Sequence, residues 1–227
     1  MIFRQLFDKE SSTYTYLIAD ATTRETILID TVLEQHERDL KLIKELELTL
    51  KYCIDTHIHA DHVTGMGKMK EATQCQIGMP HDPDVQHADF LLKGGDSLLV
   101  GPLQIKVLAT PGHTDHHLTY WVGDKIFTGD TLLIRGCGRT DFQSGSSKAL
   151  YHSIHDVLFK LPKETFVYPG HDYNGYTVST IGEELAYNPR FKNRTEQDFE
   201  SLMKDLNLAP PKKIDISVPA NKLCGIS

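Results

Sequence analysis

The chain has 227 residues, a length that fits one larger domain with a sizeable hydrophobic core. Hydrophobic residues make up 40% of the chain and charged residues 24%, which is typical of a globular protein in water. The net charge of -7 argues against broad nucleic-acid binding, because such binding needs a clustered basic surface. No apolar run approaches the roughly 20 residues of a membrane-spanning helix, so no membrane partner is expected.

The first residues and the cysteines bear on the compartment. Residues 1–8 lack the pattern of a secretory signal, and acidic residues follow early, unlike in an organellar transit peptide. The four cysteines are well separated and form no C-x-x-C pair. A chain of this size has a core and needs no disulfide framework. We therefore expect a cytoplasmic protein with reduced thiols.

Strand and helix patterns alternate along the chain. The stretches 34–48 and 147–161 have the apolar spacing of helices, and Gly65 opens a shorter helical segment. Strand patterns lie at 13–18, 26–30, 50–55, 76–79, 97–100, 103–110, 118–122, 125–128 and 166–168. With no internal repeat, low-complexity tract or linker, residues 1–227 are expected to form a single α/β domain.

Four potential metal ligands lie within six residues, directly after the strand pattern at 50–55. They are His57, His59, Asp61 and His62. Imidazole nitrogens and carboxylate oxygens are ligands for zinc, iron and manganese. Side chains two residues apart point the same way on an extended segment, so His57 and His59 can converge on one point. The cluster therefore predicts a metal site.

Three further polar residues each follow the end of a strand pattern and adjoin a glycine. His113 follows Gly112, Asp130 follows Gly129, and His171 follows Gly170. Glycine lets the backbone turn sharply and approach a bound ion without a Cβ in the way. Four such groups in order along the chain predict that these side chains join the same site.

The seven residues reproduce the motif H-x-H-x-D-H, His, Asp, His, so the chain resembles the metallo-β-lactamase superfamily. This resemblance runs from the first strands to about residue 175. It implies a metallo-β-lactamase-like αββα sandwich, with two mixed β-sheets flanked by helices and a metal site at one edge. The segment from about residue 175 is expected to complete that edge. The superfamily includes hydrolases, nucleases, oxidoreductases and sulfur-handling enzymes, so the motif alone does not define the reaction.

The segments 132–143, 168–173 and 218–225 are similar to the ethylmalonic-encephalopathy-type persulfide dioxygenases, and this similarity covers nearly the whole chain. It implies oxidation of glutathione persulfide with O2 and water to sulfite and glutathione, in sulfide detoxification. It also implies one non-haem Fe(II) per chain, held by His57, His113 and Asp130, and suggests a homodimer. Two imidazoles and one carboxylate leave coordination positions for substrate and O2.

The remaining motif residues, His59, Asp61, His62 and His171, then read as the remnant of a second metal site. We expect them to orient ligands, hold water or move protons. Because every ligand of a two-metal site is still present, the sequence also leaves open that they bind a second ion.

Other residues have two interpretations each. Arg139 can bind a glutathione carboxylate or pair with Asp141. Tyr173 can hydrogen-bond substrate or oxygen near the iron, or be a core tyrosine. Cys137 and Cys224 lie in segments matching the family near its active site, or are small buried apolar groups, which we favour for Cys53 and Cys75. His116 and His117 can join a hydrogen-bond network or face solvent, and we favour solvent.

Two alternative functions remain. A glyoxalase-II-like hydrolase of acyl-glutathione thioesters would use two metals and all seven motif residues. We expect this less, because the chain shows no long helical C-terminal extension for binding glutathione. A non-catalytic metal-binding protein is the alternative from another class, and open coordination beside a cavity argues against it.

Overall fold

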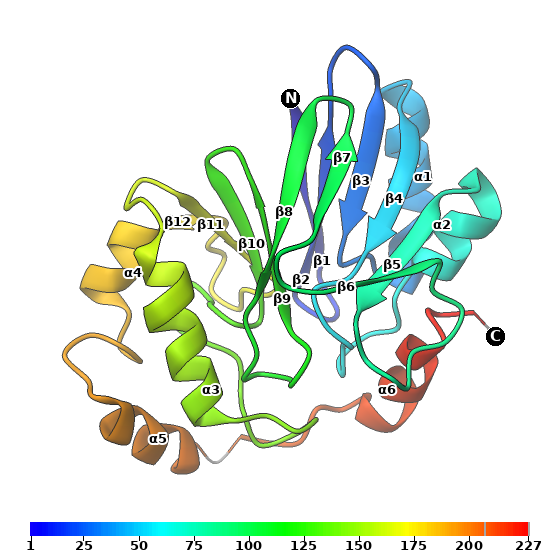
Figure 1. Cartoon of the computed structure of the whole chain (residues 1–227). Coiled ribbons are helices and arrows are strands. Elements are labelled where there is room, and N and C mark those ends of the chain that lie inside the picture. Colours follow the sequence, from blue (N-terminus) through cyan, green and yellow to red (C-terminus); the bar gives the residue numbers. More distant parts are fainter. Residues whose placement is uncertain (207, 227) are drawn as a thin grey trace. The chain divides into compact units, whose positions relative to one another are not determined.

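A computed structural model describes residues 1–206 and 208–226 of the chain (Figure 1). The contacts divide the chain into two compact units. The first unit takes in residues 1–92, 97–105 and the C-terminal segment from 210. The second takes in residues 93–96 and the stretch from 106 to 209. That the whole chain acts as a single domain stays a prediction.

The first sheet contains six strands whose order in space follows the sequence. It combines an antiparallel part, β1 to β3, with a parallel part, β3 to β6. Every side chain of β2 is buried, which fits its apolar and aromatic sequence TYTYLIA. The strands are β1 (Ile2–Asp8), β2 (Thr13–Ala19), β3 (Glu25–Ile29), β4 (Thr49–Ile54), β5 (Gln76–Pro80) and β6 (Phe90–Leu92).

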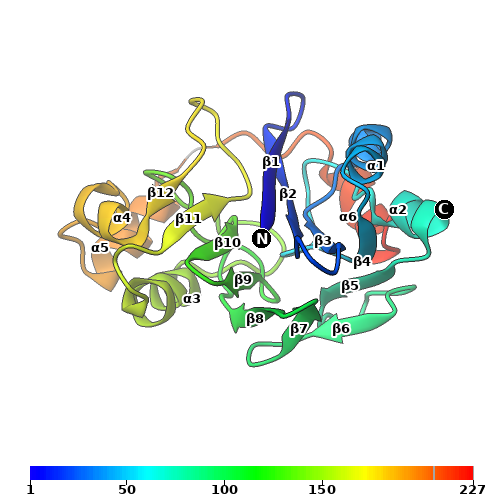
Figure 2. The ribbon, with the colours of Figure 1, turned by 90° about the horizontal axis from the view of Figure 1, so that it is seen from above.

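Three helices accompany this sheet: α1 (His36–Glu45), α2 (Met66–Thr73) and α6 (Ile214–Lys222). They lie beside its strands when the molecule is seen from above (Figure 2). Leu17 and Leu28 of the strands share one hydrophobic core with Ile43 of α1 and Met69 of α2. This core supports the loop that leaves the end of β4, because α2 begins just beyond that loop.

The second sheet has the order β12-β11-β10-β9-β8-β7. It is also mixed, since β10 and β11 run parallel whereas β8–β9, β9–β10 and β11–β12 are antiparallel pairs. Its strands are β7 (Ser97–Val100), β8 (Leu103–Ala109), β9 (Leu118–Val122), β10 (Lys125–Gly129), β11 (Phe166–Pro169) and β12 (Ser179–Thr180).

The second unit has its own hydrophobic core. Helices α3 (Ser147–His152), α4 (Ile181–Tyr187) and α5 (Glu196–Lys204) contribute Leu150, Ile181 and Phe199 to it. These side chains pack with Ile126 of β10 and Val167 of β11. The core therefore supports the ends of the two strands that carry Asp130 and His171.

The two mixed sheets and their helices confirm the predicted fold class. The predicted helix at 34–48 is a 3-10 turn at Leu33–Gln35 followed by α1, which ends at Glu45, two residues before Glu47 adopts a left-handed backbone with a φ of 50°. The predicted helix at 147–161 passes from α through a π turn, Ser153–Val157, into a 3-10 turn. None of the helices described here combines the length and apolar character that a membrane crossing requires.

Candidate metal centre

The first four predicted ligands lie on the loop between β4 and α2, in the first unit. The ring centroid of His59 lies 4.1 Å from that of His57 and 4.4 Å from that of His62. All three imidazoles are at most 1% exposed. One potential ligand atom from each of His59, Asp61 and His62 lies within 4.8 Å of the other two. The structure therefore brings the predicted cluster together.

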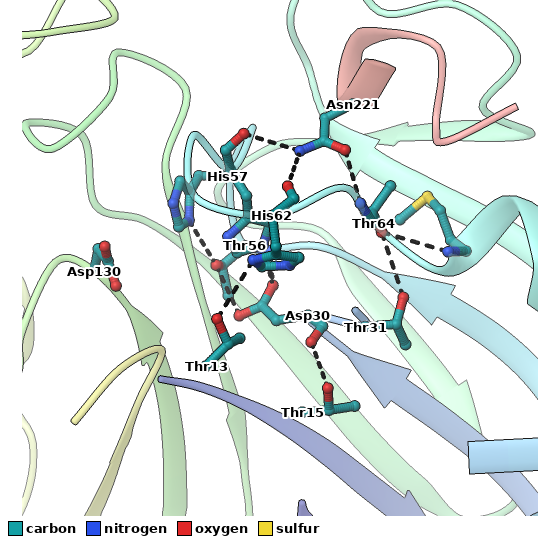
Figure 3. A network of polar contacts seen from close by, with 12 residues as sticks. Thr13, Thr15, Asp30, Thr31, Thr56, His57, His62, Thr64, Asp130 and Asn221 are labelled. Carbon is teal, nitrogen blue, oxygen red and sulfur yellow. Dashed lines mark hydrogen bonds and ion pairs between the residues drawn. The ribbon is translucent and has the colours of Figure 1, made fainter. Parts of the chain in front are cut away.

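A hydroxyl group and a buried carboxylate orient His57 (Figure 3). Thr56 Oγ1 donates to Asp30 Oδ2 at 3.0 Å and lies 2.9 Å from His57 Nδ1. Because the hydroxyl proton points to Asp30, Nδ1 of His57 carries the proton and donates to Thr56. The backbone amide of Thr56 adds a 2.7 Å bond to Asp30 Oδ1. This arrangement makes Nε2 the nitrogen of His57 that can bind a metal.

His59 lies in a buried charged group with Asp30 and Asp55. Its Nε2 is 3.2 Å from Asp30 Oδ1. Burial alone would lower the pKa of His59, but the two carboxylates raise it to about 10. Burial raises the pKa of Asp55 to about 7, against the effect of the His59 charge. Because the Asp30 carboxylate accepts a hydrogen bond from Nε2, Nδ1 is the nitrogen of His59 that could face a second ion, so both interpretations of His59 stay open.

Asp61 and His62 contact each other at the end of the cluster. His62 Nδ1 lies 2.9 Å from Asp61 Oδ2. Thr13 Oγ1, at the start of β2, donates to the same carboxylate oxygen at 3.2 Å. The two side chains thus belong to a hydrogen-bonded group anchored on the sheet.

His113, Asp130 and His171 come together in the second unit. His113 Nε2 lies 3.5 Å from Asp130 Oδ2, and His171 Nε2 lies 3.6 Å from Asp130 Oδ1. His113 Nδ1 donates to the carbonyl oxygen of Arg139 at 2.7 Å, so its Nε2 is the nitrogen that can bind a metal. Asp130 therefore lies between two imidazoles at the ends of β8, β10 and β11.

Gly138 packs closely against both Asp130 and His113. Its amide donates to the carbonyl oxygen of Asp130 at 2.7 Å. A Cβ at this position would lie 2.4 Å from that oxygen and 2.8 Å from His113 Nδ1. Only a residue without a side chain fits here, so the segment 138–139 fixes Asp130 and His113 together.

The prediction that His117 faces solvent is wrong. The residue is 1% exposed. Its Nε2 accepts the amide proton of Asp130 at 3.1 Å, and its Nδ1 lies 3.0 Å from Thr131 Oγ1. Because Thr131 donates its own proton to the carbonyl of Thr110, Nδ1 of His117 is the donor in that contact. His116 is 38% exposed and pairs with Asp115, as expected of a residue that faces solvent.

Arg139 makes an ion pair with Asp141 through two bonds of 2.6 and 2.7 Å. It also donates to the carbonyl oxygens of Leu208 and Ala209. The structural ion pair between Arg139 and Asp141 is therefore formed. A contact between Arg139 and a substrate carboxylate stays a prediction. Tyr173 is 72% exposed and stacks on His171, with centroids 6.0 Å apart. Its exposure excludes the core-tyrosine interpretation.

Cys53, Cys75 and Cys224 are buried, and Cys137 is partly buried against the core of the second unit. Burial raises the pKa of Cys137 and of Cys224 to about 12, so both stay protonated near neutral pH. Cys224 donates to the carbonyl of Gln86 at 3.2 Å, and the sulfur of Cys137 lies 3.8 Å from that of Met203. Burial also raises the pKa of Cys53 well above its ordinary value.

Sequence reasoning missed several supporting residues. Asp30 lies directly after β3, and the same strand-end position had singled out His113, Asp130 and His171. The position directly after a strand could thus have indicated Asp30 as a residue of the site. No pattern in the sequence connects Asn221 with the loop between β4 and α2, although the fold does so.

The fold and the ligand pattern agree with the family comparison. The Metallo-beta-lactamase superfamily model matches residues 8–171, which is more than half of the chain. The chain belongs to the metallo-β-lactamase superfamily. A metallo-beta-lactamase from Staphylococcus aureus is 26% identical with a TM-score of 0.91, over 98% of this chain and 72% of the other.

Closer similarity identifies the branch. Persulfide dioxygenase ETHE1, mitochondrial, from Mus musculus and from Homo sapiens is 48% and 47% identical, over 100% of this chain and 89% of each relative. The crystal structure of ETHE1 from Myxococcus xanthus has a TM-score of 0.97 and 54% identity, over 99% of this chain and 100% of the other. Within the superfamily, the chain belongs to the persulfide dioxygenases.

Proposed function

We propose that the chain is a persulfide dioxygenase that oxidises glutathione persulfide with O2 and water to sulfite and glutathione. The supporting observation is the 48% identity with persulfide dioxygenase ETHE1 over the full length of this chain. A match of this extent includes the segments 132–143 and 218–225, which lie outside the ligand motif. The similarity therefore concerns more than metal binding.

The proposed cofactor is one Fe(II), with His57, His113 and Asp130 as ligands. The donor chemistry fits: both imidazoles use Nδ1 in a hydrogen bond, which leaves Nε2 as the ligating atom. Within the described residues, Asp130 Oδ1 is buried without a hydrogen-bond partner, although it lies 3.6 Å from His171 Nε2. Two imidazoles and one carboxylate are a typical ligand set of non-haem iron oxygenases. Bound iron supplies the electron transfer that lets O2 react with a sulfur compound.

The surrounding residues have distinct supporting roles. Thr56 and Asp30 orient the His57 ring, the Arg139 carbonyl orients His113, and His117 holds the backbone amide of Asp130. We propose that His59, Asp61, His62 and His171 position these ligands rather than bind a second ion. We propose that the guanidinium of Arg139 contacts a glutathione carboxylate and that the exposed phenol of Tyr173 hydrogen-bonds substrate or oxygen near the iron.

Two further predictions accompany this function. The mammalian relatives are named as mitochondrial, and a cytoplasmic location for this chain stays a prediction. The homodimer suggested by the family is also a prediction, which sedimentation of the purified protein would test.

An oxygen-uptake assay tests the function. The protein is purified anaerobically with iron, mixed with glutathione persulfide, and monitored for O2 consumption and sulfite together. We expect both, with about one iron per chain, and loss of both in Asp130→Asn. Absence of O2 consumption together with rapid hydrolysis of S-lactoylglutathione would instead identify a two-metal hydrolase. Inertness in both assays with a filled metal site would indicate a non-catalytic metal-binding protein.

A further inference from the structure

The C-terminal helix α6 carries a buried amide, Asn221, that contacts the loop between β4 and α2. Asn221 is 0% exposed. Its Nδ2 donates to the carbonyl oxygens of His59 at 2.9 Å and of His62 at 2.8 Å. Its Oδ1 accepts the amide proton of Thr64 at 2.8 Å. Figure 3 shows the side chain between these backbone groups.

These three bonds replace the regular structure that the loop lacks. Residues 55–63 form neither helix nor strand, so their backbone groups have no repeating set of partners. A buried carbonyl or amide without a partner is costly, and one side chain here satisfies three of them. Because the bonds go to backbone atoms, Asn221 constrains the path of the loop and, through it, the position of His57.

The chain after α6 is shaped to bring Asn221 to the loop. Gly225 follows the helix with a left-handed φ of 64°. A Cβ on Gly225 would lie 2.4 Å from the carbonyl oxygen of Thr64. A Cβ on Gly67, in the first turn of α2, would lie 2.8 Å from the carbonyl oxygen of Gly225. The backbone at Gly225 therefore packs directly against the backbone of Thr64 and of Gly67, with no room for a side chain between them.

We propose that Asn221 is a positioning residue that holds the loop from His57 to Thr64 in the conformation that iron binding by His57 requires. The inference rests on the proposed ligand set only in its last step, from the loop to the metal. The hydrogen bonds between Asn221 and the loop can be tested without any metal.

The chain provides a matched control on the same helix. Ser217 lies one turn before Asn221 and is also 0% exposed. Among the described residues its Oγ has no hydrogen-bond partner, so it makes no bond to the loop. Ser217→Ala therefore perturbs the buried face of α6 without removing a loop contact. Asn221→Asp keeps the acceptor for the Thr64 amide and removes both N–H donors, whereas Asn221→Ala removes all three bonds.

The experiment measures amide exchange in the metal-free protein and iron release to a chelator in the loaded protein. In Asn221→Ala we expect the Thr64 amide to exchange at least about tenfold faster, and iron to leave about 10 to 100 times faster. In Asn221→Asp the Thr64 amide should stay protected while iron release is still accelerated. Ser217→Ala should match the wild type in both measurements.

Activity adds a readout that separates positioning from folding. With iron restored at saturation, Asn221→Asp should lower kcat while KM for the persulfide changes by less than about twofold. Equal exchange and equal iron release in Asn221→Ala and Ser217→Ala would overturn the proposal, even if both unfold more easily. A wild type that binds no iron would refute the proposed function, while the exchange of Thr64 would still decide whether Asn221 holds the loop.

Discussion

Thr56 carries a hydroxyl group that contacts both the His57 imidazole and the Asp30 carboxylate. Replacing it with valine keeps the shape of the side chain and removes the acceptor for His57 Nδ1. Removing such a partner of a metal-ligand histidine typically weakens metal binding 10- to 100-fold. We expect a loss of iron affinity in this range for Thr56→Val, measured by competition with a chelator.

Thr26→Val is the control for that substitution. Thr26 is buried in the adjacent strand β3, and its hydroxyl donates to the carbonyl of Arg24, away from the loop. The iron affinity of the Thr26→Val variant should match that of the wild type. Unchanged iron affinity in Thr56→Val would show that the hydroxyl does not orient His57.

Gly138 allows a second test in the other unit. In Gly138→Ala the new methyl group would lie 2.4 Å from the carbonyl oxygen of Asp130, so the segment must move. Because the neighbouring carbonyl of Arg139 holds His113, we expect iron content to fall at least about tenfold. Metal analysis of the purified variant measures this.

Gly136→Ala is the matched control, two residues earlier. The nearest atom to a Cβ at Gly136 is 3.7 Å away, an ordinary contact distance. Gly136→Ala should therefore retain its iron. Full iron content in both variants would mean that the close approach of Gly138 is not required.

His155 predicts a pH effect on stability. Burial lowers its pKa, and its Nε2 has no hydrogen-bond partner within the described part of the chain. The unfolded chain therefore binds a proton on His155 more readily than the folded chain does. The free energy of unfolding is accordingly highest above about pH 6.5, with respect to His155, and decreases as the pH falls below that value. His155→Phe should stabilise the fold by about 1 kcal/mol and reduce the loss of stability between pH 7 and pH 5.

Urea unfolding at the two pH values measures this prediction. The ring of His155 stacks on Tyr151, with centroids 4.1 Å apart, and meets Phe159 edge-on, so a phenyl ring has suitable neighbours. An identical pH dependence in the variant and the wild type would show that His155 does not titrate across unfolding.

At the scale of single residues, the sequence predicted which side chains gather but not what supports them. His57, His59, Asp61 and His62 are adjacent in the chain, so their proximity follows from connectivity. The role of His117 depends on the backbone of Asp130, 13 residues later, and on Thr131. Contacts of this kind depend on how β9 and β10 pair, and no local pattern encodes them.

Helix α5 begins with a capping box that can be tested directly. Thr195 accepts a bond from the amide of Asp198, and the Asp198 carboxylate accepts the amide of Thr195. We expect Thr195→Ala to lower the free energy of unfolding by about 1 kcal/mol, because the Asp198 amide loses its acceptor and the Asp198 carboxylate loses the hydroxyl donor. Iron content should not change, and urea unfolding measures the effect.

Ser201→Ala on the same helix is the comparison. Its exposed hydroxyl bonds only the carbonyl of Gln197 one turn back, among the contacts described for it. Ser201→Ala should lower the free energy of unfolding by less than Thr195→Ala does. If the two variants have equal stability, the capping box does not stabilise α5.

At the scale of elements, the strands with continuous apolar or alternating patterns were predicted and the short ones were not. β2 and β10 are nearly or fully buried, so their patterns are strong. β12 has two residues and β6 has three, which is too short for any periodicity. β1 has only one buried residue, Asp8, and its place depends on pairing with β2.

At the scale of the whole molecule, the proposed ligand set makes a prediction about stability and amide exchange. If iron binds His57, His113 and Asp130, it should protect the backbone amides beside each of these three residues. Saturating iron at 100 times its dissociation constant adds about 2.7 kcal/mol to the free energy of unfolding. We therefore expect slower exchange at the amides of Thr56 and Gly138 on adding iron.

A ligand-set variant gives the control. In Asp130→Asn, iron should no longer protect the Gly138 amide. Protection of only one of these two amides in the wild type would contradict the proposed ligand set. The order of the motif residues in the sequence suggests the proposed iron ligands. The amides of Thr56 and Gly138, which test that ligand set, are identified only by the folded structure.

The bonds from Asn221 also bear on the order of events during synthesis. Thr64 precedes Asn221 by 157 residues. At about 5 to 20 residues per second, a ribosome needs roughly 8 to 30 seconds to cover that interval. During this time the emerging loop already carries its histidines but not the amide that holds them in place. The loop can therefore acquire its final conformation only once translation of α6 is complete, and metal loading is expected to follow that step.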